Sequence, residues 1–191
     1  MTFDFAAARL KMLDGQVRTS DVTDYALQDA IGAVAREALC PPDKLALAYA
    51  EAEIPYAPGR WLMKPREVAK LLQLLRPRPG ERALAIAAPY AAAVMREMGL
   101  VVDQLDEGDL SSPQAGDGYD VVICEQAVSI APQGWLDAMA PGGRMALVER
   151  NGPVGKAKLY VKAESGLASR EAFDSTPPML PGFEKSPQFA F

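Results

Sequence analysis

GERALAIAAPYAAAVMREMG, residues 80–99, contains a short apolar run, a turn and a segment with helical spacing. This pattern predicts a strand over 83–88 and a helix over 90–98. In nucleotide-binding α/β proteins, glycines in such a turn let the backbone approach a cofactor closely. Here the turn is Ala87-Ala88-Pro89-Tyr90, which has no glycine. The stretch therefore predicts an α/β fold, and the lack of glycine leaves open whether this turn binds a ligand.

The chain after residue 80 continues this alternation. Further strands are predicted over 100–105, 119–124 and 144–149, with a short helix over 132–140. KAKLYVKAESGLASREAFD then predicts a hairpin that turns near Ser165-Gly166. Alternating strands and helices favour a mostly parallel, doubly wound sheet with helices on its faces, and the hairpin adds antiparallel strands at one edge.

The first 80 residues predict a helical N-terminal cap on that sheet. We expect helices over 1–13, from the Thr23 or Asp24 cap to Ala38, over 44–53, and from Pro65 to Leu75, with an irregular stretch over 54–64. We interpret 1–191 as a single domain, with 1–80 as the cap region and 81–191 as the sheet region.

Composition narrows the classes of function. The 191-residue chain has a net charge of −5, so we expect no nucleic-acid partner. It has no histidine and only two cysteines, far apart, so neither a Ser-His or Cys-His pair nor a zinc ligand set is available. We identify no catalytic residue and expect no metal. The N-terminus does not resemble a signal peptide and no run is long enough to span a membrane, which favours a cytoplasmic protein.

Three stretches together resemble the protein-L-isoaspartate O-methyltransferase family. They are VAREALCPPDKLALAYAEAEIPY over 34–56, RWLMKPREVAKLLQLLRPRPGERALAI over 60–86, and YDVVICEQAVSIAPQGWLDAMAPGGRMALVE over 119–149. The resemblance implies the class I methyltransferase fold, which is Rossmann-like with a seven-stranded sheet. It also implies methyl transfer from S-adenosylmethionine to an isoaspartyl carboxylate, a protein-repair reaction.

The cofactor turn departs from the family pattern, which runs acid, hydrophobic residue, G-x-G-x-G-Y. Aligned on Leu84, Ile86 and Tyr90, this chain has Ala85 in place of the acid and no glycine. Alanine at a position that needs positive φ costs roughly 1 kcal/mol or more, and Pro89 removes an amide donor. We therefore expect this turn not to bind S-adenosylmethionine as the family does.

A second departure lies between the strands at 100–105 and 119–124. Residues 106–118 are too few for a crossover helix and a strand, so one βα unit is predicted to be missing. Either Asp106 or Asp109 matches an acidic position of the family, and the deletion leaves the choice open.

Tyr90, Asp106 and Glu125 are the candidate cofactor-binding residues, on position alone, because each follows a predicted strand at one edge of the sheet. A basic cluster of Arg60, Lys64, Arg66 and Lys70 is a candidate for an acidic partner, against the simpler interpretation of a solvated helix start.

Two functions remain open from the sequence. The first is a pseudoenzyme of the family that has lost its cofactor and binds a protein partner. The second is an active S-adenosylmethionine-dependent protein carboxyl methyltransferase with a rebuilt cofactor site.

Overall fold

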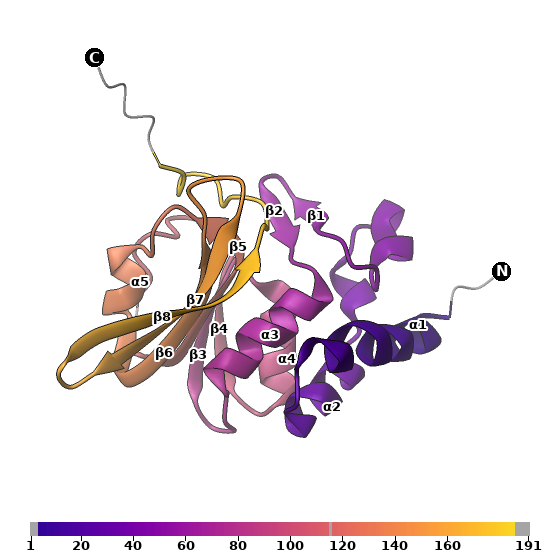
Figure 1. The fold of residues 1–191 in the computed structure, drawn as a ribbon, viewed down its shortest axis with the longest axis horizontal. Helices are drawn as coiled ribbons and strands as arrows, with labels where there is room; N and C mark the ends of the chain where they lie inside the picture. Colours follow the sequence, from indigo (N-terminus) through magenta and orange to yellow (C-terminus); the bar gives the residue numbers. More distant parts are fainter. Residues whose placement is uncertain (1–3, 115, 186–191) are drawn as a thin grey trace, which may run out of the picture.

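The fold is an α/β sandwich with a helical cap, seen in a computed structural model that describes residues 4–114 and 116–185 (Figure 1). Within these residues the main sheet has six strands in the order β4-β3-β5-β6-β7-β8. Strands β4, β3, β5 and β6 are parallel, and β7 and β8 are antiparallel additions. The strands are β3 (Arg82–Ile86), β4 (Val101–Leu105), β5 (Tyr119–Val128), β6 (Met139–Glu149), β7 (Gly155–Ala163) and β8 (Gly166–Ser175).

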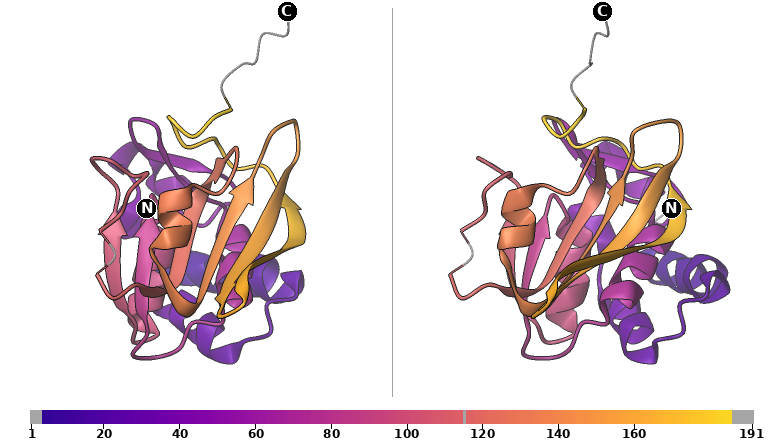
Figure 2. Two further views of the ribbon diagram at one scale, coloured as in Figure 1. Left: turned by 90° about the vertical axis from the view of Figure 1, so that its left-hand side faces the viewer. Right: turned by 60° about the vertical axis from the view of Figure 1, so that its left-hand side comes forward.

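Helices cover both faces of the sheet (Figure 2). Helices α3 (Pro65–Leu75) and α4 (Pro89–Glu97) pack on one face, and the short α5 (Gln133–Asp137) packs on the other. The mostly parallel sheet and the C-terminal hairpin confirm the predicted fold class. Between β4 and β5, the described residues contain no helix or strand, so the sheet has one strand fewer than the seven that the resemblance implied.

The cap is built from short helices that pack against α3 and α4. Asp24 accepts a hydrogen bond from the backbone N–H of Leu27, so the predicted cap of the second helix is confirmed. The elements are α1 (Phe5–Met12), η1 (Leu13–Val17), η2 (Arg18–Ser20), α2 (Tyr25–Ala33), η3 (Arg36–Leu39) and η4 (Pro42–Leu47). None of the helices in the described part of the chain is long and apolar enough to cross a membrane.

Three predictions about the cap are wrong. The second helix, expected to run to Ala38, ends at Ala33, and Arg36–Leu39 forms a separate 3₁₀ helix in which Arg36 donates to the carbonyls of Ala48 and Met63. The stretch 44–53 is not an α-helix, because η4 is a 3₁₀ helix that ends at Leu47. Tertiary contacts override helix propensity here, since the Ala48 carbonyl accepts from Arg36 and the Tyr49 hydroxyl bonds to Glu37. The stretch 54–64, predicted irregular, forms an antiparallel hairpin of β1 (Ile54–Ala57) and β2 (Arg60–Leu62).

Strand β5 is longer than predicted and carries an irregularity. Its pairing with β6 shifts between Ile123 and Ala127, so two extra β5 residues are accommodated there. Glu125 and Gln126 lie in this irregular part, and both are fully buried. Glu125 therefore lies inside β5 rather than after the end of a strand.

The C-terminal segment 176–185 runs beside β5 where β3 has ended. β3 pairs with β5 as far as Cys124, and Ala127 then forms a parallel bridge with Met179. The apolar residues of the tail 175–191 predict that it packs against the domain, with Leu180, Phe183, Phe189 and Phe191 turned inward. For the first two this is confirmed, because Leu180 is buried and the Phe183 ring lies 5.3 Å from that of Trp135. The same prediction for Phe189 and Phe191 falls outside the described residues.

Candidate functional site

The turn between β3 and α4 is the position where this kind of fold holds a ligand. Ala87 has φ +44°, the left-handed region that favours glycine. Pro89 is the first residue of α4 and has no N–H to offer. Ala87, Ala88 and Tyr90 are all 0% exposed, so the turn is enclosed by other parts of the chain.

Glu125 reaches this turn from β5. One carboxylate oxygen lies 2.8 Å from the backbone nitrogen of Ala91, in the first turn of α4, and the other lies 3.1 Å from that of Met63. Both backbone N–H groups donate to the carboxylate. Since the first N–H groups of a helix have no partner inside the helix, the Glu125 side chain satisfies the end of α4 from within the protein.

Burial raises the pKa of the Glu125 carboxyl to about 7. The guanidinium of Arg36 and the amides of Ala91 and Met63 act in the opposite direction, because they stabilise the charged form. The carboxyl therefore changes its charge near neutral pH while it is held by two elements of the fold.

Arg36 completes the cluster from the cap. Its guanidinium is fully buried, donates to the carbonyl oxygens of Ala48 (2.8 Å) and Met63 (2.7 Å), and lies 4.5 Å from the centre of the Tyr90 ring. Within the described residues, Arg36 Nη1 and the Tyr90 hydroxyl have no hydrogen-bond partner. Burial raises the pKa of Tyr90, so this phenol stays neutral at physiological pH.

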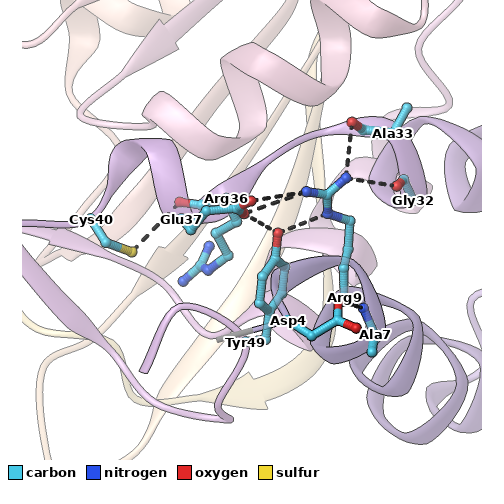
Figure 3. A network of polar contacts seen from close by, with 9 residues as sticks. All are labelled: Asp4, Ala7, Arg9, Gly32, Ala33, Arg36, Glu37, Cys40 and Tyr49. Atoms are coloured by element: carbon cyan, nitrogen blue, oxygen red, sulfur yellow. Dashed lines mark hydrogen bonds and ion pairs between the residues drawn. The ribbon is translucent and has the colours of Figure 1, made fainter. Parts of the chain in front are cut away.

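A second polar network holds the cap together next to Arg36 (Figure 3). Arg9 donates through Nε to the Tyr49 hydroxyl at 2.7 Å and through Nη2 to Glu37 at 3.1 Å. The Tyr49 hydroxyl donates in turn to Glu37. Arg36 and Glu37 are neighbours in η3, yet their side chains have different partners. Glu37 faces Arg9 (Figure 3), whereas Arg36 donates to the carbonyl of Met63, the residue whose N–H donates to Glu125.

Asp106 lies directly after β4 and outside this buried cluster. Its carboxylate accepts from the Tyr56 hydroxyl (3.2 Å) and from the Gln104 amide (3.0 Å), and its backbone carbonyl accepts from Arg60 (3.1 Å). Asp109 is exposed, and among the described residues it accepts bonds from the backbone and hydroxyl of Ser111. Of the two acids that the sequence left open, Asp106 is the one at the strand end.

The three candidate residues are thus only partly brought together. Tyr90 and Glu125 share the buried cluster, whereas Asp106 lies outside it and bonds to Tyr56, whose pKa is raised by burial and by the charges of Asp106 and Glu125. Neither of two cavities, of about 280 and 320 Å³, is lined by any of the three. Their role in binding a cofactor stays a prediction.

Sequence reasoning missed Arg36, although it lies in the 34–56 stretch that carries the family resemblance. An arginine next to a glutamate inside an otherwise apolar segment, A-R-E-A-L, was the available signal, because charged residues are almost never fully buried without partners.

All four residues of the candidate basic cluster have partners within the chain, and two of them are paired with carboxylates. Lys64 pairs with Glu53 at 3.1 Å and Arg66 pairs with Glu51 at 3.0 Å. Arg60 bonds to the Asp106 carbonyl, and the Lys70 ammonium lies 4.1 Å from the centre of the Phe173 ring. This geometry favours the simpler interpretation of a solvated helix start over an acidic-partner site.

The Gln126 side chain, next to Glu125, is hydrogen-bonded to two segments that are distant from it in sequence. Gln126 donates to the carbonyl oxygens of Gly59 (3.2 Å) and Met179 (3.3 Å), and its own oxygen accepts from the Trp61 backbone (3.3 Å). The β1–β2 hairpin and the C-terminal segment therefore both close on β5 next to Glu125.

Solved structures share this fold. A protein-L-isoaspartate O-methyltransferase structure matches 92% of this chain and 67% of its own, with a TM-score of 0.76 and 17% identity. A putative protein-L-isoaspartate O-methyltransferase from Plasmodium falciparum, in complex with S-adenosyl-L-homocysteine, matches 94% of this chain and 99% of its own, with a TM-score of 0.73 and 13% identity.

Sequence comparison extends the likeness from fold to family. No protein-family model matches the chain. A protein-L-isoaspartate O-methyltransferase from Methylorubrum populi is 32% identical over 92% of this chain and 96% of its own length. One from Methylorubrum extorquens is 29% identical over 94% and 91%. With this identity along nearly the whole of both chains, the chain belongs to the protein-L-isoaspartate O-methyltransferase family.

Proposed function

We propose that this protein is a non-catalytic member of its family, which does not bind S-adenosylmethionine and acts by binding a protein partner. The observation that carries the proposal is the contact of the Glu125 carboxylate with the first turn of α4 at 2.8 Å. A ligand bound at the turn after β3 would compete with this carboxylate for the same end of the helix.

The turn itself also opposes a cofactor. Close approach of a ligand to the backbone needs residues without a side chain, and here Ala87 and Ala88 are alanines with no exposed surface. Pro89 offers no amide. In this proposal the residues present do not fit S-adenosylmethionine, and no methyl-transfer step is assigned to them.

The alternative is an active carboxyl methyltransferase with a rebuilt site, which the names of the full-length relatives favour. An isoaspartyl carboxylate is already ionised and nucleophilic near neutral pH, so the lack of histidine does not argue against this alternative. The two functions are therefore distinguished by whether the protein binds S-adenosylmethionine.

Calorimetric titration with S-adenosylmethionine and S-adenosylhomocysteine, up to millimolar ligand, separates them. We expect no heat of binding and no thermal shift, and no methyl transfer to an isoaspartyl peptide under conditions where an active isoaspartyl methyltransferase modifies it. Saturable binding at micromolar ligand would overturn the proposal and restore the enzyme.

A further inference from the structure

β4 ends the sheet, and half of its backbone hydrogen-bonding groups face outward. The Val101 N–H donates to the Glu81 carbonyl at 2.9 Å, and the Leu105 carbonyl accepts from Ala87 at 3.0 Å, both toward β3. Because neighbouring residues of a strand direct these groups to opposite sides, Val102 and Gln104 direct theirs away from the sheet.

These outward groups are largely free. Within residues 4–114 and 116–185, the N–H groups of Val102 and Gln104 have no acceptor, while Arg96 donates to the Val102 carbonyl at 3.2 Å. The side chains of β4 are also open, since Val101 is 60% exposed and the Asp103 side chain 54%. A free edge of this kind is a template for pairing with another extended chain.

The chain that forms and follows this edge is mostly acidic, although one cation, Arg96 of α4, lies on the edge and donates to the Gln104 side chain at 2.7 Å as well as to the Val102 carbonyl. Residues 101–118 contain five acidic residues and no lysine or arginine: Asp103, Asp106, Glu107, Asp109 and Asp117. Arg82 compensates one of them, since it pairs with Asp103 at 3.4 Å. An extended segment that carries lysine or arginine side chains would complement the remaining carboxylates.

A second copy of this chain fits the edge poorly. Antiparallel pairing of two β4 strands over their full length is centred on Asp103, so it places Asp103 directly opposite Asp103 of the other copy. Like charges directly opposite one another destabilise a strand pair. Charge therefore favours a different protein as the occupant.

We propose that the outer edge of β4 binds an extended, basic segment of a protein partner, which adds a strand to the sheet through the outward groups of Val102 and Gln104. This inference rests on the proposed function, because it assigns a place to the partner binding proposed there. The described residues between β4 and β5 form no strand that would cover this edge, so it is available for β-strand addition.

The test uses two model peptides and residue-resolved amide signals of the full chain. The probe is a heptapeptide of alternating lysine and valine, and the control replaces each lysine with glutamate. We expect the lysine peptide to shift the NMR signals of the Val102 and Gln104 amides and slow their hydrogen exchange, with an affinity that falls as salt rises. The glutamate peptide is expected to leave both amides unchanged.

Two variants at position 104 separate the backbone from the side chain. Gln104→Ala keeps the outward N–H and should bind the lysine peptide within about threefold of the unmodified protein. Gln104→Pro removes that N–H and should weaken binding at least tenfold. Circular dichroism and thermal unfolding establish that each variant is folded.

A third variant tests the charge contribution. Glu107→Lys, an exposed change that leaves the strand intact, should weaken binding by about threefold through charge alone.

Several outcomes would overturn the inference. These are no binding at millimolar peptide, amide shifts centred away from β4, or equal binding by the glutamate peptide. Dimers in sedimentation that Gln104→Pro abolishes would make a second copy the occupant. The cofactor titration is independent of these readouts, so binding of S-adenosylmethionine together with protection of β4 would refute the proposed function and keep the edge site.

Discussion

The carboxylate of Glu125 joins the backbone nitrogen of Ala91 at 2.8 Å to that of Met63 at 3.1 Å. Ala91 belongs to α4, and Met63 belongs to the connection between β2 and α3. One buried side chain from the middle of the sheet thus ties a helix terminus to the cap. Helix N-termini in α/β proteins are suited to anions, and here the anion is part of the chain.

We expect Glu125→Ala to lower the free energy of unfolding by about 3 kcal/mol or more, because two buried amides lose their hydrogen-bond acceptor and the buried Arg36 guanidinium loses a nearby opposite charge. Glu125→Gln keeps one acceptor oxygen and should cost about 1–2 kcal/mol. Urea unfolding followed by circular dichroism measures both. Glu107→Ala, on an exposed loop, is the control and should change stability by less than about 0.5 kcal/mol. Equal losses for Glu125→Ala and the control would contradict the role given to Glu125.

The free energy of unfolding should depend on pH through the titration of the Glu125 carboxyl. Its folded pKa of about 7 lies above the ordinary value of 4.5, so between these pH values the folded state binds more protons than the unfolded state. Stability therefore falls as pH rises from about 4.5 to about 7 and is flat above that for this group. The measurement is the difference in unfolding free energy between the unmodified protein and Glu125→Gln across this range. A difference that does not change with pH would show that the carboxyl titrates normally.

Ala87 should tolerate glycine but not valine. At φ +44° alanine is strained by roughly 1 kcal/mol, and Ala87→Gly relieves this strain while it removes a buried methyl worth about 0.8 kcal/mol. The net change should be within about 1 kcal/mol. Ala87→Val adds volume and a branched side chain in the same backbone region, and should cost more than about 2 kcal/mol. Thermal unfolding measures both, with Ala93→Val on α4 as the control for a valine at an ordinary helical position. A small effect of Ala87→Val would mean that the turn is more open than its burial indicates.

Arg9 should matter more to stability than its distance from the sheet suggests. Its pair with Glu37 is only 16% and 17% exposed and includes Tyr49, and burial together with the bond to Glu37 raises the pKa of Tyr49 to about 12. Arg9→Ala is expected to cost about 1–3 kcal/mol in chemical unfolding. Lys156→Ala breaks the exposed pair with Asp174 and should cost less than about 1 kcal/mol. Similar losses for the two variants would argue against a buried network.

The parts of the fold that follow from local pattern were predictable. The helix from Pro65 to Leu75 has leucines and a valine at helical spacing, and the structure begins and ends it at those residues. The strand before Ala87 and the missing βα unit after β4 likewise follow from short-range patterns and segment lengths. The stretch 44–53 has equally good helical residues but forms a 3₁₀ turn, because Ala48 and Tyr49 are bound by side chains of η3 and α1.

The sequence by itself determined the α/β alternation, the absence of glycine at the cofactor turn and the family resemblance, because each is written in contiguous residues. Only the tertiary structure decided what replaces the missing glycines. Glu125 meets amides 34 and 62 positions away, and Arg36 reaches the same cluster from the cap. A charged side chain can be buried only when hydrogen-bond donors or an opposite charge compensate for the water it loses. For Glu125 and Arg36 these partners come from distant segments, which meet only when the chain has folded.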